Sequence, residues 1–158
     1  MRIVTAPQTY RKPRTLFLAG GITGCPNWQN EFINKLSEAW TRIDPSQVVL
    51  FNPRRDDFNI KDRSATHEQI KWEYQKLAEA DAHLFWFPKE TLCPITLFEL
   101  GKVLMWNKPL FIGTEPGYGR SEDVFEQLQL VRPNKPVEKS LDMLVSQVYC
   151  WYKEANGE

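Results

Sequence analysis

The chain has 158 residues, 42% of them hydrophobic, and carries 20 basic and 20 acidic side chains. A single domain of this length buries enough apolar surface to fold without disulfides or metals, and the hydrophobic content argues against intrinsic disorder. The zero formal net charge gives no general reason to expect binding to long nucleic acid or to an anionic membrane, whereas it is compatible with a small, locally charged ligand.

Short apolar runs alternate with helical patterns along the whole chain. Buried strands are predicted at residues 15–19, 48–51, 82–87 and 109–112. Helices are predicted from Pro26-Asn27 to before Asp44-Pro45, from Thr66 to about Ala80, and at residues 96–107, 121–130 and 140–154. Continuous apolar strands that alternate with helices are typical of a parallel sheet covered on both faces. We therefore expect one α/β domain over residues 15–158, with a doubly wound parallel sheet of about five strands, after an N-terminal extension over residues 1–14.

Local patterns predict details of three helices. Thr66 and Gln69 match a capping box, and an inward stripe is expected at Ile70, Tyr74 and Leu77. Glu99 is expected in the first turn of the helix over residues 96–107, where the helix dipole would stabilise its carboxylate. The next helix has candidate caps in Ser121 and Asp123. The final helix is predicted to be amphipathic, with an inward side formed by Leu141, Leu144, Val145, Val148 and Tyr152.

The cysteines and histidines are few and scattered. Cys25, Cys93 and Cys150 form no CxxC pair, and the two histidines lie in no recognisable motif. We therefore expect neither a disulfide framework nor a zinc site, and no metal or other cofactor. No stretch approaches the roughly 18 apolar residues of a membrane span, and the first 14 residues lack the apolar run of a signal peptide. A cytoplasmic protein with no membrane partner is expected.

Ligands of open parallel sheets bind beyond the carboxyl ends of the strands, so the segments that follow the strands contain the candidate site residues. Gly20, Gly21 and Ile22 follow the first strand. The glycines would let backbone N–H groups approach a ligand near a helix N-terminus, although a tight strand-to-helix turn alone would also explain them.

Asn52, Arg54 and Arg55 follow the second strand. Adjacent arginines at a strand end can bind a phosphate with paired hydrogen bonds. A solvated charged loop is the alternative interpretation of this segment.

Glu99 follows the third strand, and Glu73 lies on the helix before that strand. A carboxylate above the sheet edge could attack an anomeric carbon, because glycosyl transfer commonly uses a carboxylate nucleophile together with a second acid or base. Alternatively, Glu99 only satisfies a helix dipole and Glu73 is an ordinary solvated carboxylate.

Four segments, LFLAGGITG, FNPRR, IKWEYQKLAEADAHLFWF and ITLFELGKVL, resemble in this order the nucleoside 2-deoxyribosyltransferase-like superfamily over about residues 16–112. The ELG of the last segment, on the predicted helix over residues 96–107, is the most specific part. The resemblance implies a flavodoxin-like fold and cleavage of the bond between a nucleobase and a 2-deoxyribosyl group. It implies that Glu99 is the nucleophile that forms a covalent glycosyl-enzyme, and that Glu73 contacts the base and helps its protonation.

The resemblance also assigns expected roles to other residues. Gly20 and Gly21 would lie near the sugar, and Cys93 stands where the transferases carry Asp and the related nucleotide hydrolases often carry Ser. Thr91 or Thr96 is then an alternative contact for the sugar hydroxyl.

A residue from the later loop of a neighbouring subunit often completes each site in this family. Asp123 stands about where the transferases place such an Asn, so a homo-oligomer of two or more subunits is expected. Arg54 and Arg55 would suit a 5′-phosphate.

Three hypotheses follow. The first is an enzyme that transfers or hydrolyses the N-glycosidic bond of a nucleoside, deoxynucleoside or nucleoside monophosphate. The second is a nucleotide sensor without turnover or an NAD-cleaving domain, since the same fold family includes both. The third is an interaction domain suggested by the six tryptophans, which ranks last because most of them lie at core-like helical spacing.

Overall fold

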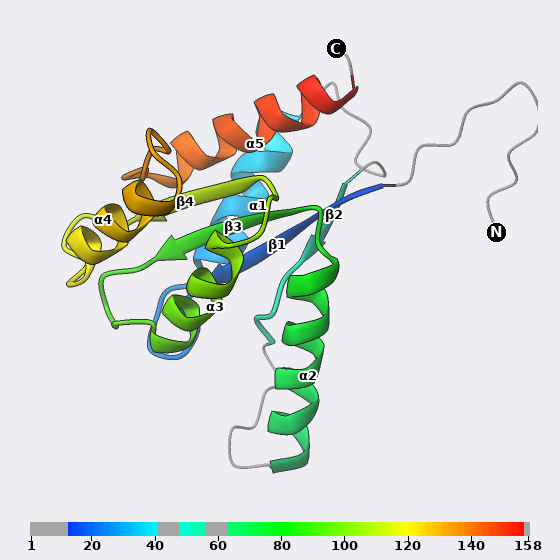
Figure 1. Cartoon of the computed structure of the whole chain (residues 1–158). Coiled ribbons are helices and arrows are strands. Elements are labelled where there is room, and N and C mark those ends of the chain that lie inside the picture. Colours follow the sequence, from blue (N-terminus) through cyan, green and yellow to red (C-terminus); the bar gives the residue numbers. More distant parts are fainter. Residues whose placement is uncertain (1–12, 41–47, 56–62, 157–158) are drawn as a thin grey trace, which may run out of the picture.

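The computed structural model describes residues 13–40, 48–55 and 63–156. The elements are β1 (Arg14–Gly20), α1 (Trp28–Ala39), β2 (Val48–Phe51), α2 (Arg63–Glu79), β3 (Ala82–Phe87), α3 (Pro94–Leu104), β4 (Leu110–Thr114), α4 (Ser121–Val131) and α5 (Leu141–Asn156), as labelled in Figure 1. Most of the predicted N-terminal extension lies outside the described residues, as do the predicted stop at Asp44-Pro45 and residues 56–62.

The described strands form one parallel sheet in the order β2-β1-β3-β4. Helices α1 and α5 pack on one face, and α2, α3 and α4 lie on the other. The predicted doubly wound α/β fold is confirmed. In these parallel pairings the carboxyl ends of all the strands meet at one edge of the sheet.

The expected sheet of about five strands is wrong, because the described residues form four. Where a fifth strand would pair with β4, the chain makes only an isolated parallel bridge between Gly113 and Glu138. Glu138 N donates to Ile112 O at 2.8 Å, and Glu138 O accepts from Thr114 N at 2.9 Å. Two residues earlier, Pro136 has no N–H with which to extend that ladder. Because α5 begins at Leu141, the segment ends before it becomes a strand.

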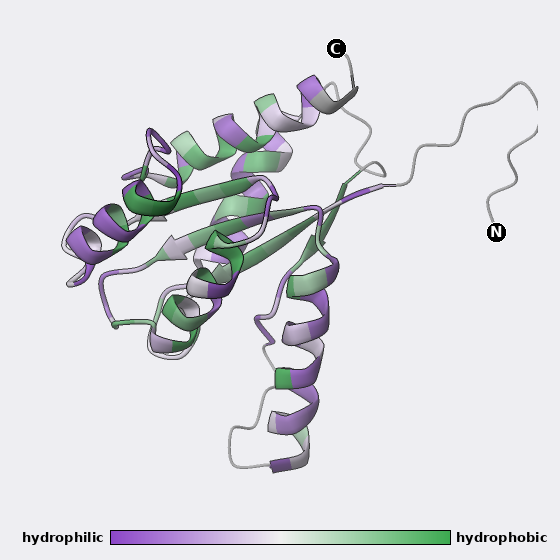
Figure 2. Ribbon diagram, in the orientation of Figure 1, coloured by the Kyte–Doolittle hydropathy of each residue, from purple (hydrophilic) through white to green (hydrophobic). Residues whose placement is uncertain are grey.

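Alternate residues of β1 serve the two cores. Leu16 and Leu18 belong to the core under α1 and α5, whereas Phe17 and Ala19 belong to the core on the opposite face. Full burial of each Leu or Phe side chain contributes about 1.5–3 kcal/mol, so β1 is fixed on both faces. Figure 2 shows the same pattern as hydrophobic strands between helices of mixed polarity.

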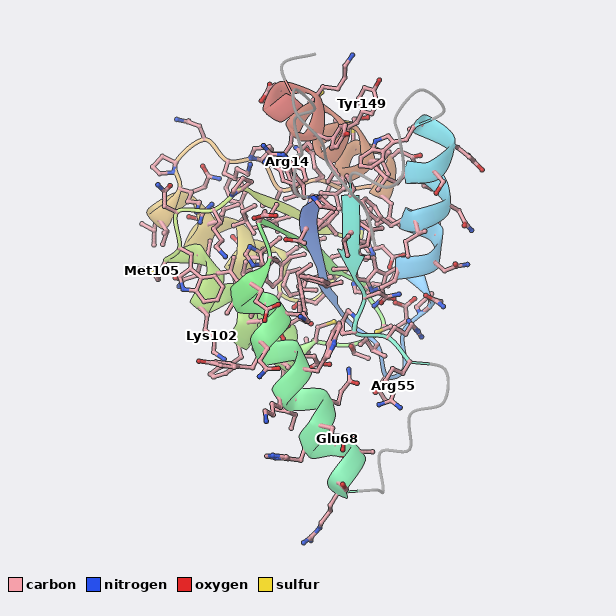
Figure 3. All side chains as sticks on the ribbon, turned by 90° about the vertical axis from the view of Figure 1, so that its right-hand side faces the viewer. Arg14, Arg55, Glu68, Lys102, Met105 and Tyr149 are labelled. Atoms are coloured by element: carbon pink, nitrogen blue, oxygen red, sulfur yellow. The ribbon has the colours of Figure 1, made fainter. Side chains whose placement is uncertain are left out.

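Helix α2 departs from its predicted inward stripe. Ile70 and Tyr74 are 60% and 65% exposed, and Leu77 alone of the three is buried. The N-terminal half of α2 projects beyond the body of the molecule, where no sheet lies beneath it (Figures 1 and 3). The helix also begins at Arg63, so Thr66 is already inside it and the predicted capping box is wrong.

Of the other helix predictions, some are confirmed and one is wrong. The inward residues of α5 are all buried as predicted, and α1 begins after Asn27, whose side chain accepts a hydrogen bond from Asn30 N. The predicted cap of α4 is wrong, because Arg120 holds the cap position without a side-chain hydrogen bond and Ser121 is the first helical residue. Across the described ranges, no helix is both long and apolar enough to cross a membrane.

Candidate active site

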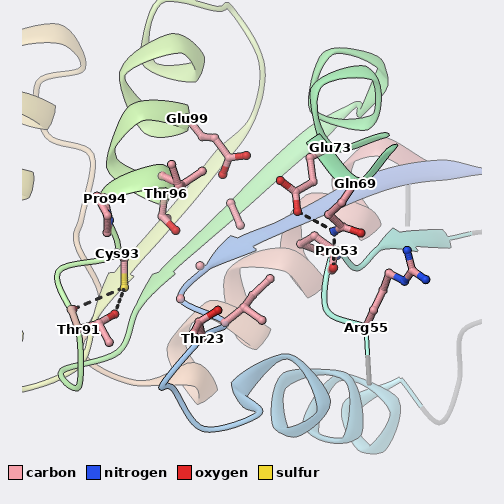
Figure 4. A pocket seen from close by; sticks show the side chains of 15 residues that line it. Thr23, Pro53, Arg55, Gln69, Glu73, Thr91, Cys93, Pro94, Thr96 and Glu99 are labelled. Atoms are coloured by element: carbon pink, nitrogen blue, oxygen red, sulfur yellow. Dashed lines mark hydrogen bonds between the residues drawn. The ribbon is translucent and has the colours of Figure 1, made fainter. Parts of the chain in front are cut away.

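A cavity of about 480 Å³ opens at the carboxyl ends of β1 and β3 (Figure 4). Such a volume is typical of small-molecule sites. The cavity is lined by Ala19, Gly20, Gly21, Ile22, Thr23, Pro53, Arg55, Gln69, Glu73, Thr91, Cys93, Pro94, Ile95, Thr96 and Glu99. The parallel topology explains the position, because the loops that follow the strands converge at this edge of the sheet.

Most of the predicted site residues meet in this cavity: Gly20, Gly21, Ile22, Arg55, Glu73, Cys93, Thr96 and Glu99. Three predicted residues do not line it. Asn52 lines an adjoining cavity of about 310 Å³. Arg54 donates to backbone carbonyls, and Asp123 is exposed in the first turn of α4.

Glu73 on α2 and Glu99 on α3 project toward one another across the cavity (Figure 4). The pKa of Glu99 is raised from its ordinary 4.5 to about 7, chiefly by burial and in addition by nearby Glu73, while Lys102 opposes the shift. Burial likewise raises the pKa of Glu73, against the effect of a hydrogen bond from Gln69. The site therefore holds two carboxyl groups that favour their protonated forms and repel each other as anions.

The expected dipole stabilisation of Glu99 is wrong. Helix α3 begins at Pro94, two residues earlier than predicted, since proline suits the first helical position. Glu99 is thus the sixth residue of the helix, and the dipole acts mainly within the first turn. Burial dominates instead and shifts the pKa in the opposite direction.

Gln69 is a cavity residue that the sequence patterns assigned to a helix cap. Its Nε2 donates to Glu73 Oε1 at 2.7 Å and to Pro53 O at 2.8 Å. It thereby ties the Glu73 carboxylate to the loop after β2. The signal in the sequence was the four-residue spacing from Glu73, which places both side chains on one face of a helix.

The adjacent arginines have separate surroundings. The Arg54 guanidinium donates to the carbonyls of Pro26, Cys25 and Ile22, at 2.8, 3.0 and 3.4 Å, and to Gln29 Oε1 at 3.1 Å. Arg54 therefore holds the loop after β1 in place. Arg55 is exposed and lines both cavities.

The two glycines at the end of β1, Gly20 and Gly21, are required by packing. A Cβ at Gly20 would lie 2.4 Å from Trp28 Cζ2 and 2.4 Å from Trp86 O, and a Cβ at Gly21 would lie 2.6 Å from Cys25 Sγ. No side chain fits at either position, so the backbone itself forms this wall of the cavity.

The loop between β3 and α3 presents Cys93 and two threonines. Cys93 caps α3 in a left-handed conformation with φ 47°, and its Sγ lies 3.3 Å from Thr91 Oγ1. Thr96 is buried and lines the cavity with them. Tyr118 OH donates to Leu92 O at 2.9 Å, which anchors the loop to the segment after β4.

Asp123 occupies the first turn of α4, away from the cavity. It is exposed, and its Oδ2 lies 3.5 Å from Arg120 Nη1. Within the described residues, no three His, Cys, Asp or Glu side chains gather in a group that could hold a metal ion.

The sequence pattern of the family described as nucleoside 2-deoxyribosyltransferase like matches residues 13–118. The match covers more than half of the chain and includes every residue that lines the cavity. A comparison with curated proteins gave no match. The extent of the family match shows that the chain belongs to the nucleoside 2-deoxyribosyltransferase-like family.

Proposed function

We propose that the protein cleaves or transfers the N-glycosidic bond of a deoxynucleoside, or of its monophosphate, through a covalent glycosyl-Glu99 intermediate. One observation carries the proposal: Glu99 and Glu73 face each other across a nucleoside-sized cavity in a member of this family. Paired carboxyl groups on opposite sides of a substrate supply the nucleophile and the acid that glycosidic cleavage needs.

The proposed reaction uses the form of the carboxyl pair that holds one proton. In the reactive form Glu99 is ionised and the proton lies on Glu73. The Glu99 carboxylate attacks C1′ while the bond from C1′ to the base nitrogen breaks, and Glu73 donates its proton to the departing base. Water or a second base then attacks C1′ and releases Glu99. Transfer and hydrolysis differ only in this last step.

The adjoining cavity supports a substrate that extends beyond a nucleoside. It shares Pro53, Arg55 and Gln69 with the main cavity. Arg55 can meet a 5′-phosphate there, because its guanidinium offers paired donors to phosphate oxygens. Arg54 is a poorer candidate, since its guanidinium already donates to four protein oxygens.

The surface around the cavity supports a homo-oligomer of two or more copies. Ile70 and Tyr74 on α2, and Ile95 and Phe98 on α3, are each at least 60% exposed. Lys102 Nζ lies 4.2 Å from the centre of the Phe98 ring and 5.8 Å from that of Tyr74, so the two helices present one continuous surface. Exposed apolar surface of this kind commonly marks an interface. Light scattering of the wild type and of Phe98→Glu would test it, with the variant expected to dissociate.

The proposed reaction is tested by incubating the protein with deoxynucleosides and their monophosphates, with and without a second free base, and separating the products. Free base alone indicates hydrolysis, and an exchanged base indicates transfer. Glu99→Gln should lower turnover by at least about 10³-fold, as removal of a catalytic nucleophile does. Glu79→Gln is the matched control, because Glu79 pairs with Lys76 at the far end of α2 and its loss should leave turnover unchanged.

Three outcomes would contradict the proposal. Equal turnover in Glu99→Gln and the wild type would show that Glu99 is not the nucleophile. Release of nicotinamide from NAD, with no cleavage of deoxynucleosides, would favour the NAD-cleaving hypothesis. Tight nucleotide binding that Glu99→Gln retains, with no product from either protein, would favour a sensor.

A further inference from the structure

Two cysteines from distant parts of the sequence converge at the wall of the cavity. A Cβ at Gly21 would lie 2.6 Å from Cys25 Sγ and 2.8 Å from Cys93 Sγ, so both sulfurs border the same small space. Thr91 Oγ1 lies 3.5 Å from the first sulfur and 3.3 Å from the second. The thiols are therefore close neighbours, and the absence of a side chain at Gly21 is what admits both.

The two thiols differ in their access to the cavity. Cys93 lines it, whereas Cys25 lies behind the glycine turn and is not part of its lining. Both are buried, and both are free thiols in the structure. Cys150 is also free but lies exposed on α5, the helix that covers the other face of the sheet. A small reagent in the cavity would thus meet the Cys93 sulfur first, with the Cys25 sulfur directly behind it.

We propose that Cys25 and Cys93 form a reversible thiol–disulfide site in the cavity wall, which a peroxide oxidises and which switches the active site off. The disulfide itself is independent of the reaction catalysed. Its effect on turnover rests on the proposed function.

The chemistry balances in two steps. The Cys93 sulfur attacks one oxygen of a hydroperoxide, the O–O bond breaks, and the departing oxygen leaves as water or alcohol, which gives a sulfenic acid on Cys93. The Cys25 sulfur then attacks the Cys93 sulfur, the S–O bond breaks, and water leaves as the disulfide forms. Two thiols are oxidised and one peroxide is reduced. A dithiol reductant reverses the change.

Disulfide formation has a mechanical consequence for the site. The sulfurs must approach to about 2.05 Å with a fixed dihedral angle. The bond would tie the loop after β1 to the start of α3. Thr96 and Glu99 are carried by the first two turns of α3, so a shift at Cys93 displaces both. Displacements of about 1 Å at a reacting group can cost about 100-fold in rate.

The environment of Cys93 predicts when the reaction is fast. Burial raises the pKa of the Cys93 thiol, against the effect of the hydrogen bond with Thr91. The thiolate is the reactive form, so oxidation by peroxide should be slow at neutral pH and accelerate as the pH rises.

Peptide mapping tests the proposal directly. The wild-type protein is treated with hydrogen peroxide, unreacted thiols are blocked, and the protein is digested with trypsin. Cys25 lies in the peptide of residues 15–35, Cys93 in that of residues 90–102 and Cys150 in that of residues 140–153. We expect the first two peptides to become cross-linked within one chain, and turnover to fall in parallel and return after reduction with dithiothreitol.

Two variants separate the steps. Cys25→Ser should give no cross-link and should accumulate a sulfenic acid on Cys93, captured by dimedone in the peptide of residues 90–102. Cys150→Ser should form the same cross-link as the wild type. Because Cys25 does not line the cavity, a persistent dimedone adduct in Cys25→Ser would assign the order of the two sulfurs.

The site is overturned if Cys25 and Cys93 stay reduced while Cys150 is oxidised, or if cross-links form only between chains through Cys150. The switch is overturned if the disulfide forms and turnover does not change. A protein without turnover in either redox state would overturn the glycosidic function, and the peptide map, which needs no substrate, would still decide whether the thiol pair forms.

Discussion

Gln69 Nε2 donates a 2.7 Å hydrogen bond to Glu73 Oε1, four residues further along α2. The same nitrogen donates to Pro53 O at 2.8 Å, so the amide group is fixed between helix and loop. This bond favours the charged form of Glu73, while burial favours the neutral form of both carboxyl groups. The carboxyl pair is therefore asymmetric before any substrate binds.

Gln69→Leu should raise the pKa of Glu73 further, because it removes the donor that opposes burial. Carbon-13 NMR titration of the glutamate carboxyl groups measures this without substrate. The matched control is Gln75→Leu, since Gln75 is an exposed residue of the same helix. A Glu73 titration that is identical in Gln69→Leu and the wild type would show that the amide does not set the protonation of the pair.

The pH dependence of turnover should report the ionisation of Glu99. The reactive pair holds one proton, and the charge of Glu73 already contributes to the Glu99 pKa of about 7. The last proton therefore leaves the pair near pH 7, and kcat/KM should fall as the pH rises through this value. In Glu73→Gln only Glu99 of the pair titrates, without the neighbouring charge that raises its pKa. The fall near pH 7 should then disappear, while the maximal rate is lower because the acid is lost. A fall near pH 7 that persists in Glu73→Gln would contradict the coupling of the two carboxyl groups.

The free energy of unfolding should also depend on the ionisation of Glu99. The pKa of Glu99 is 4.5 in an unperturbed state and about 7 in the fold, so the folded protein binds more protons between these values and loses stability as the pH rises through them. At pH 8 the buried charge should cost about 3 kcal/mol. Glu99→Gln carries no charge, so its stability relative to wild type should improve by about 2 kcal/mol from pH 5 to pH 8. Urea unfolding at the two pH values measures the change, and Glu79→Gln should show no such improvement.

The sequence predicted correctly those elements that are buried along their whole length. The strands could be predicted because each is an apolar run, and the parallel order then brought Glu73, Glu99 and the glycine turn to one edge of the sheet. The site could thus be assembled from topology and a few chemically distinctive residues. The inward face of α5 was predicted correctly for the same reason, since the whole helix packs on the sheet.

The sequence predictions were wrong where the surroundings of a side chain depend on tertiary structure that a local pattern does not contain. The stripe containing Ile70 and Tyr74 has helical spacing, but α2 projects past the sheet that would have covered it. Gln69 matched a capping box, yet it contacts a loop 16 residues away in the sequence. The first turn of α3 was misplaced because Pro94 was not taken as its start. The expected pKa shift of Glu99 was wrong in direction because burial, which the local pattern does not reveal, dominates it.

Arg54 and Arg55 are adjacent in the sequence, which does not distinguish their roles, but the structure assigns them different surroundings. Arg54→Met removes hydrogen bonds to four protein oxygens that hold the loop after β1. The free energy of unfolding should fall by about 2 kcal/mol, as expected for charged hydrogen bonds that leave buried acceptors behind.

Arg55→Met alters an exposed side chain, so it should change stability by less than about 0.5 kcal/mol. Arg55→Met should instead weaken substrate binding. The KM for a deoxynucleoside monophosphate should rise about 10-fold to 100-fold, because its phosphate loses a charged contact. The KM for the deoxynucleoside, which has no phosphate, should change little. Equal rises for both substrates would place the phosphate elsewhere, and a greater loss of stability in Arg55→Met than in Arg54→Met would reverse the roles assigned to the pair.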